Sequence, residues 1–333
     1  MSKALLTIKK YDKEEGMRLP GIHVKRISLI YLFSITVAAL VMMTIAGASF
    51  AAVKQKSFGS AEEAVKALIT ATRNNDDKEV LAIFGADAKD LIFSGDRVAD
   101  KQRREKVLAA YDEQNKLVPE GNSMVVVIGK NDWPFPIPLV KKGERWIFDT
   151  KQGKEEILNR RIGQNELYAI QTSLAIVDAQ REYAMTDRDG DNLHEYAEKF
   201  ASDPGKKNGL YWETKEGEDS SPLGQLLVQA KAEGYSKKGK TGGPVPYHGY
   251  YYRILKAQGK NAPGGAYDYI VKGNLIGGFA IVAYPAKYGN SGVMTFVVNH
   301  DGVVYQKNLG KNTEKIAKSI TKYDPDKTWK KAQ

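Results

Sequence analysis

The chain of 333 residues contains no cysteine. Its absence excludes disulfide bonds, thiolate catalysis, cysteine-based metal sites and a lipid anchor on a cysteine. Histidine is scarce, with four in all, and the three beyond the N-terminal segment are His194, His248 and His300. Three histidines cannot fill a closed zinc site without carboxylates. The HExxH, GxSxG and P-loop motifs are missing too, so the sequence lacks the signatures of zinc peptidases, α/β-hydrolases and P-loop proteins.

Positive charge is in small excess over negative charge. The chain has 50 Lys and Arg against 40 Asp and Glu. Residues 1–51 hold seven of the former and three of the latter, which leaves a net charge of +6 on the rest. The lysines are spread along the chain, which favours a solvated surface over a nucleic-acid groove. We therefore expect no nucleic-acid partner. The length suggests two domains, and a hydrophobic content of 42% is enough to build a core.

The N-terminal segment has the pattern of a targeting signal. Two basic residues precede an apolar run over 27–46, and the small residues Ser49 and Ala51 follow where a signal peptidase cuts. We predict a signal peptide over 1–51 and a periplasmic or secreted mature chain. The alternative is an uncleaved anchor, because the run is long enough to span a bilayer. Met17 is an alternative start to Met1.

Residues 54–150 predict a compact α+β domain. Ser60 and Glu63 form a capping box at the start of its first helix, and the strand-like runs come after the helices. This order resembles the cone-shaped fold of nuclear transport factor 2-like domains. The helices are expected over 60–74, 78–84 and 100–115, and the strands over 123–128, 135–140 and 145–149.

A linker helix is expected within 151–164, and a second α+β domain over 165–322. The latter opens with a helix to about 184, whose apolar stripe is formed by Leu167, Ile170, Leu174 and Val177 and widened by Ala169, Ser173 and Ile176. Ser221 is expected to cap a further helix. The remaining elements are a loop over 236–246, strands over 249–256, 279–284, 293–298 and 303–307, a helix over 312–322 and a loose tail over 323–333.

An acidic segment after the long helix matches the spacing of a twelve-residue calcium loop. Asp187, Asp189 and Asp191 fall at positions 1, 3 and 5. Position 6 is Asn192 instead of glycine, and asparagine tolerates the left-handed conformation that this turn needs. The carbonyl of Leu193 and the carboxylates of Glu195 and Glu198 complete the predicted ligand set at positions 7, 9 and 12. The alternative is a solvated acidic turn that caps the next helix.

An aromatic segment precedes the first strand of the second domain. Tyr247, His248, Tyr250 and Tyr252 form a possible binding face for a sugar or a ring. Cross-strand packing within a sheet is the alternative reading of the same residues.

Two resemblances are visible along the chain. The motifs at 57–60, 178–184, 187–196, 209–212, 246–252 and 277–280 resemble the bacterial domain of unknown function 2950 family, which implies no activity. Residues 165–310 are similar in plan to type IV pilin and pseudopilin head domains, some of which hold calcium in a loop. No pilin processing segment, Gly-Phe-Thr-Leu-Ile-Glu, precedes the long helix, so pilin-style polymerisation is not expected.

These observations favour a non-enzymatic binding or assembly module that has a calcium-stabilised loop and an envelope protein or polymer as partner. Membrane contact is expected only through an uncleaved leader. One alternative is a hydrolase of envelope polymer that uses carboxylates and His248, which needs a cleft with converging carboxylates. Another is a small-ligand binder with an apolar pocket in 54–150.

Overall fold

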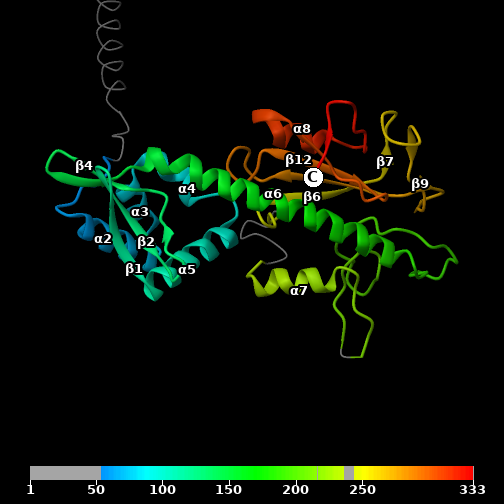
Figure 1. Cartoon of the computed structure of the whole chain (residues 1–333). Helices are drawn as coiled ribbons and strands as arrows, with labels where there is room; N and C mark the ends of the chain where they lie inside the picture. Colours follow the sequence, from blue (N-terminus) through cyan, green and yellow to red (C-terminus); the bar gives the residue numbers. More distant parts are fainter. Residues whose placement is uncertain (1–53, 216, 236–243, 333) are drawn as a thin grey trace, which may run out of the picture. The chain divides into compact units, whose positions relative to one another are not determined.

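The computed structural model describes residues 54–215, 217–235 and 244–332. Residues 53–333 form one compact unit (Figure 1). Helices and antiparallel sheets alternate in blocks, which confirms the predicted α+β class. The predicted signal peptide over 1–51 and most of the predicted loop over 236–246 lie outside the described residues. Within the described ranges, no helix combines the length and the apolar character that crossing a membrane requires.

The first half of the unit packs helices against an antiparallel sheet. The predicted cap at Ser60 is present, since its Oγ accepts from the Glu63 N–H at 3.1 Å, whereas Glu63 Oε2 accepts at 2.7 Å from the N–H of Gly59, one residue before the cap. The helices are α2 (Ala61–Arg73), α3 (Asp77–Phe84), α4 (Lys89–Ile92) and α5 (Arg97–Glu113). The strands are β1 (Asn115–Glu120), β2 (Ser123–Ile128), β3 (Trp133–Pro134), β4 (Leu139–Lys142) and β5 (Arg145–Phe148), in the order β1-β2-β4-β5 with β3 on β2.

Two features of this sheet differ from the sequence prediction. Strand β1 was not predicted, and β4 begins at Leu139 rather than 135. The proline-rich segment supplies only the two-residue strand β3, because proline has no N–H to donate to a ladder.

One helix, α6 (Thr150–Tyr183), replaces the predicted linker helix and long helix. Its N-cap is Asp149, whose side chain accepts from the Gln152 N–H at 3.2 Å. Gly163 falls within its span, where glycine is tolerated at a modest energetic cost. The predicted boundary between 164 and 165 is therefore absent from the helix itself.

The buried face of α6 covers only part of the predicted stripe. Leu167 is 55% exposed and Leu174 is 36% exposed, whereas Ala169, Ser173 and Ile176 are buried. Small side chains at two of the central positions let the helix approach the second sheet closely, and the leucines fall at the margin of the contact. The sequence identified the helix and most of its buried face, and it wrongly included Leu167 and Leu174.

The second sheet has the order β14-β13-β12-β11-β6. Helix α6 packs against β12, β11 and β6, while α8 packs against β11. The strands are β6 (Tyr250–Leu255), β11 (Ala280–Pro285), β12 (Met294–Asn299), β13 (Tyr305–Asn308) and β14 (Lys330–Lys331), and the helices are α7 (Gly224–Ala232) and α8 (Thr313–Ser319). Smaller pairs join β7 (Ala257–Gln258) to β8 (Tyr267–Asp268) and β9 (Ile270–Val271) to β10 (Asn274–Leu275).

Two predictions about this half are wrong. Ser221 does not cap α7, since Leu223 holds the cap position and no side chain bonds there. The segment after 322 is not loose over its described length. Tyr323 is 1% exposed, its N–H donates to the Ala257 carbonyl at 2.9 Å, and β14 pairs with β13. Backbone pairing and a buried ring thus fix this segment to the sheet.

The described residues contain a separate hydrophobic cluster in each half. One gathers side chains between Phe58 and Phe148, and the other gathers side chains between Ala169 and Tyr323. Polar contacts join the halves around Arg161 of α6, which is 5% exposed. Its guanidinium donates to the carbonyls of Asp90 (2.7 Å) and Leu91 and to the side-chain oxygen of Asn290. Independent folding of residues 54–150 and 165–322 stays a prediction.

Candidate functional sites

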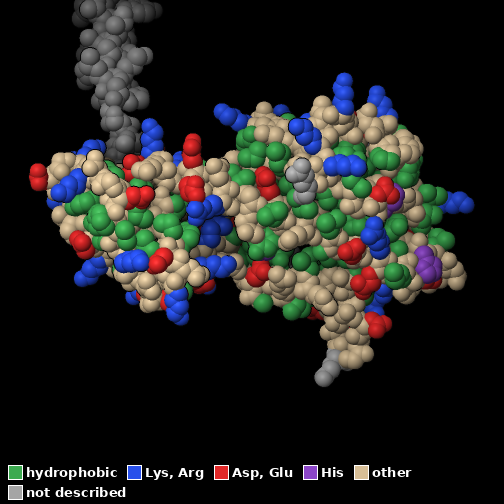
Figure 2. Space-filling view, viewed as in Figure 1, with side chains coloured by type: hydrophobic (Ala, Val, Ile, Leu, Met, Phe, Trp, Pro, Cys, Tyr) green, Lys and Arg blue, Asp and Glu red, His purple; other side chains and the backbone are tan. Residues whose placement is uncertain are grey.

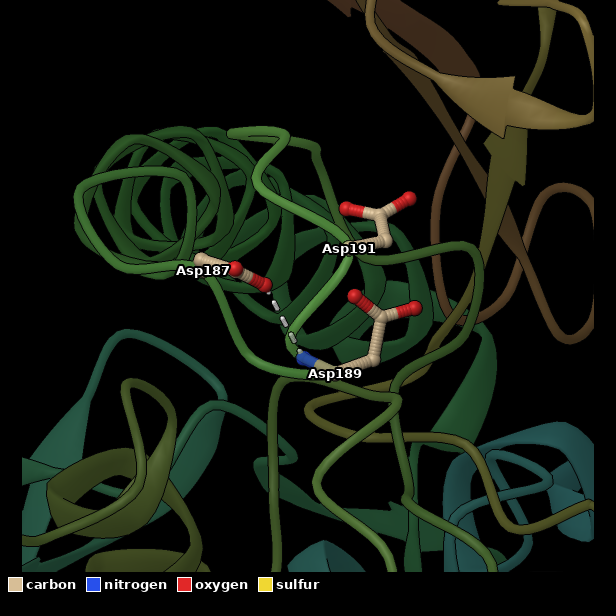
Figure 3. Close-up of side chains that lie close together, drawn as sticks. All are labelled: Asp187, Asp189 and Asp191. Carbon is tan, nitrogen blue, oxygen red and sulfur yellow. Dashed lines mark hydrogen bonds between the residues drawn. The ribbon is translucent and has the colours of Figure 1, made fainter.

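The acidic loop follows directly from the end of α6. One carboxylate oxygen from each of Asp187, Asp189 and Asp191 lies within 4.8 Å of the others (Figure 3). Asp187 Oδ1 accepts from the N–H of Gly190 at 2.7 Å, and its Oδ2 accepts from the N–H of Asn192 at 2.9 Å. These backbone donors lower the pKa of Asp187. The loop therefore wraps around the first carboxylate, and the other two are exposed beside it.

The backbone at the sixth loop position has the expected form. Asn192 has φ +65°, the left-handed conformation for which the sequence offered asparagine in place of glycine. Glu195 interacts electrostatically with the acidic cluster. Burial raises its pKa, and the charges of Asp189 and Asp191 raise it further. A carboxylate that is held near like charges becomes more stable in its ionised form when a cation neutralises those charges.

Glu198, the predicted ligand at position 12, does not join the cluster. Glu198 forms an ion pair with Lys256, which turns it toward β6 and its neighbours. Leu193 donates its N–H to Asp191 Oδ1 at 2.8 Å. Asn274 of β10 donates to Asp191 Oδ2 at 2.9 Å. No α-helix follows within the described residues up to 215, so neither a terminal helical glutamate nor the alternative of a helix cap applies.

His248 lies in a tight turn directly before β6. The Tyr247 N–H donates to the Tyr250 carbonyl at 2.9 Å, and the reverse bond measures 3.1 Å. His248 (φ +47°) and Gly249 (φ +77°) are both left-handed, as a two-residue type I′ hairpin turn requires. Gly249 is needed for space as well, because a Cβ there would meet the Asn165 side chain at 2.6 Å.

Aromatic rings and a carboxylate enclose the His248 imidazole, which is 8% exposed. Tyr168 stacks on it with the ring centroids 4.1 Å apart and an interplanar angle of 15°. Tyr247 and Tyr235 approach at 4.2 and 5.7 Å. Nε2 lies 3.1 Å from Glu233 Oε2. Burial lowers the pKa of His248, and the charge of Glu233 opposes that shift.

Asp96 links this cluster to the first half of the chain. It is 1% exposed, and its Oδ1 accepts from the N–H groups of Val98 (3.1 Å) and Ala99 (3.0 Å) at the start of α5. Its Oδ2 accepts from the Tyr235 hydroxyl at 2.8 Å and from the Gly249 N–H at 2.9 Å. Sequence reasoning missed Asp96, Glu233 and Tyr235, since they are distant from His248 in sequence or lack any motif.

The four residues of the predicted aromatic face do not share one environment. Tyr250 is fully buried, packs on Phe296 at 5.8 Å and donates its hydroxyl to the Met294 carbonyl at 3.0 Å. The hydroxyl of Tyr252 is buried as well. Only Tyr247 and His248 belong to the cluster around Glu233.

An open depression lies at the start of α6, lined by Asp149, Lys151, Gln152, Lys154, Glu155 and Leu158.

Comparison with known proteins places the chain in one family. A family model described as "Protein of unknown function (DUF2950)" matches residues 55–332. Neither the curated proteins nor the solved structures contain a match. The family match covers both sheets, α6, the acidic loop and the His248 turn. The chain therefore belongs to the DUF2950 family of proteins of unknown function.

Proposed function

We propose that this protein is a binding or assembly module that works outside the cytoplasm and holds calcium in its acidic loop. The observation that carries the proposal is the approach of three carboxylates to within 4.8 Å of one another on an exposed loop. Hard cations such as Ca²⁺ bind several oxygens at once and keep water as further ligands. With Glu198 paired to Lys256, the loop supplies three carboxylates, with Glu195 beside them.

Two features of the sequence support the location and the role. Residues 1–51 have the order of an export signal: basic residues, an apolar run and small residues. A weak calcium site fits this location, because extracellular calcium modules bind the ion weakly. The plan of a long helix followed by an antiparallel sheet resembles pilin and pseudopilin heads, which assemble with other envelope proteins. The envelope protein or polymer that binds is the partner class we propose.

Thermal unfolding in chelator and in millimolar calcium tests the calcium site. Extracellular modules bind calcium at about 10⁻⁴–10⁻³ M, so calcium at ten times such a Kd stabilises the fold by roughly 1.4 kcal/mol. Asp189→Asn should remove most of this gain. Asp189 is chosen because oxygens of Asp187 and Asp191 hold backbone N–H groups of the loop, so their loss would alter the loop itself.

Asp219→Asn is the matched control, since it removes one exposed acidic charge elsewhere on the chain. It should leave the calcium-induced shift unchanged. Identical wild-type melting curves with and without calcium would refute the calcium site and leave a solvated acidic turn. Isothermal titration of the same variants gives an independent reading of binding.

A second candidate function is hydrolysis of envelope polymer at His248. The observation in its favour is the 3.1 Å approach of His248 Nε2 to Glu233, which is the geometry of a histidine base oriented by a carboxylate. The lowered pKa of His248 keeps it neutral, as a general base must be. Polymer hydrolysis by the wild type that His248→Asn abolishes would favour this candidate. Equal product release by both proteins would exclude a role for His248.

A further inference from the structure

Positive charge is concentrated at the C-terminal end of the chain. Residues 305–333 contain eight lysines, no arginine and three acidic residues, a net charge of +5. Residues 52–304 contain 35 basic and 34 acidic residues, a net charge of +1. The excess charge beyond residue 51 therefore lies almost wholly in the segment that forms β13, α8 and β14.

Strand register places two of these lysines, Lys307 and Lys331, on one side of the second sheet. Arg253 donates to the carbonyls of Ala317 (2.8 Å) and Ile320 (2.6 Å), so its face of β6 looks toward α8. Across the sheet, Arg253 pairs with Val282, and Val282 pairs in turn with Val297 and that with Tyr305. Side chains alternate along a strand, so Lys307 lies on the same side as Tyr305.

The edge strand continues this face. Lys331 pairs with Tyr305 and therefore points to the same side. Trp329, two residues before it, shares that side, and the Lys307 ammonium lies 5.8 Å from its ring centroid. On the alternate side of β6, Tyr252 lies beside Thr172 of α6. The lysine-bearing side is thus the one that α8 covers.

We define the lysine face as α8 with its two flanking turns and the adjoining surface of β13 and β14. Lys and Arg side chains project from the surface above α8 and the C-terminal segment (Figure 2). Its members are Lys307, Lys311, Lys315, Ile316, Lys318, Lys322, Trp329 and Lys331, of which only Lys307 and Trp329 are half-buried.

Each acidic residue of this segment has a partner in the structure, although among the described residues only Glu314 pairs with a cation, and the net charge of +5 counts all three. Glu314 pairs with Lys318 at 2.6 Å. Asp324 accepts from the backbone and side chain of Asn261 at 2.7 and 3.1 Å, and Asp326 accepts from the Thr328 N–H at 2.8 Å. Lys311, Lys315 and Lys322 are exposed beside them, and their charges produce the positive electrostatic field of the face.

We propose that the lysine face docks on the surface of an anionic phospholipid bilayer. Lysines are point charges that suit a layer of phosphates without fixed geometry, whereas recognition of an individual phosphate favours the fork of arginine. Ile316 is 39% exposed among the lysines, and Trp329 lies on the same side. An apolar residue and a tryptophan amid lysines match the composition of membrane-interface surfaces.

Trp329 provides a local probe, so the full chain can be used even if its N-terminal segment inserts in lipid. The full chain is incorporated in phosphatidylcholine vesicles with and without phosphatidylglycerol, each with a brominated acyl chain as quencher. Subtracting the signal of Trp329→Phe isolates this residue from the other three tryptophans. We expect quenching of Trp329 only with the anionic lipid, and its loss in high salt, which shortens the range of the attraction.

The triple variant Lys311→Gln, Lys315→Gln, Lys322→Gln tests the face. Each lysine near an anionic surface contributes about 1 kcal/mol, or about fivefold, so the ratio of docked to undocked molecules should fall on the order of a hundredfold. The matched control, Lys66→Gln, Lys142→Gln, Lys151→Gln, removes the same charge from exposed sites in the first half and in α6.

We expect the control triple to dock like the wild type. Equal quenching in the two kinds of vesicle, or equal loss in the two triple variants, would overturn the proposal. So would binding to a soluble polyanion, such as polyphosphate, with no quenching in anionic vesicles, because the face would then serve a dissolved polymer.

Discussion

At the residue scale, His248 stands where a different residue would fit the backbone better. Both central positions of its turn have positive φ, for which Asn-Gly is the preferred pair. A histidine in the left-handed region costs of the order of 1 kcal/mol. The imidazole repays that cost through its stack on Tyr168 and its contact with Glu233. The contacts of the imidazole, rather than the backbone conformation of the turn, explain why histidine occupies this position.

The stability of the protein should depend on pH through His248. Burial lowers its pKa in the folded state, whereas the unfolded chain has the ordinary value of about 6.5. The unfolded state therefore binds the proton more readily. The free energy of unfolding should be fully supported above pH about 6.5 and should fall as the pH drops toward the folded-state pKa. Besides Glu233, the charges that act on this group are those of Asp96 and Lys106.

His248→Asn separates the imidazole from the turn, because asparagine suits the left-handed backbone. Near neutral pH it should lower the free energy of unfolding, because the lost stack, worth about 1 kcal/mol, and the lost contact with Glu233 together exceed the backbone strain that asparagine relieves. Urea unfolding at several pH values between about 5.5 and 7.5 measures the difference between the two proteins. That difference should shrink toward low pH. A constant difference would contradict the predicted role of His248.

At the element scale, the two glycines of α6, Gly153 and Gly163, differ in how much space surrounds them. Gly153 in its first turn is packed against the proline-rich segment, where a Cβ would meet Ile137 Cγ1 at 2.7 Å and the Pro136 carbonyl still more closely. Gly163 has nothing within 4 Å of such a Cβ. The same substitution thus has opposite consequences ten residues apart in one helix.

Gly163→Ala should raise the free energy of unfolding by about 1 kcal/mol, because alanine is the better helix former. Gly153→Ala should lower it by about 2 kcal/mol, since the backbone of the proline-rich segment has to move. Urea unfolding of the pair measures both values, and each variant serves as the control for the other. Stabilisation by both would show that α6 does not approach residues 136–137 as closely as described.

At the scale of the whole molecule, Arg161 connects the two hydrophobic clusters. Burial, with a contribution from Arg103, lowers its pKa to about 10, so it stays charged at neutral pH. Its donors satisfy the carbonyls of Asp90 and Leu91 at the end of α4 and the side chain of Asn290 beyond β11. Three segments that are remote in sequence thus share one guanidinium.

Arg161→Met should destabilise the protein by about 3 kcal/mol, because it leaves buried carbonyls without a donor. The control is Arg160→Met. Arg160 is exposed and pairs with Glu156 one turn earlier, so its loss should cost less than about 0.5 kcal/mol. Chemical unfolding followed by fluorescence and circular dichroism compares the two. Similar small losses would show that the halves are joined by other contacts.

The sequence by itself determined the features that depend on near neighbours. The α+β class, the helix cap at Ser60 and the turn at Asn192 follow from hydrogen bonds and periodicities within a few residues. The sequence predicted a linker helix followed by a separate long helix, whereas the structure joins both in the continuous α6.

Only the tertiary structure decided which residues of the α6 stripe are exposed, where Glu198 points and what surrounds His248. The partners of these groups lie far away in sequence. Glu198 meets Lys256, and His248 meets Tyr168 and, through Tyr235, Asp96. The same holds for the lysine face, whose charges are visible in the sequence, because Lys307 and Lys331 share a side only through strand register. Local patterns specify conformations, whereas side-chain environments depend on how remote elements pack.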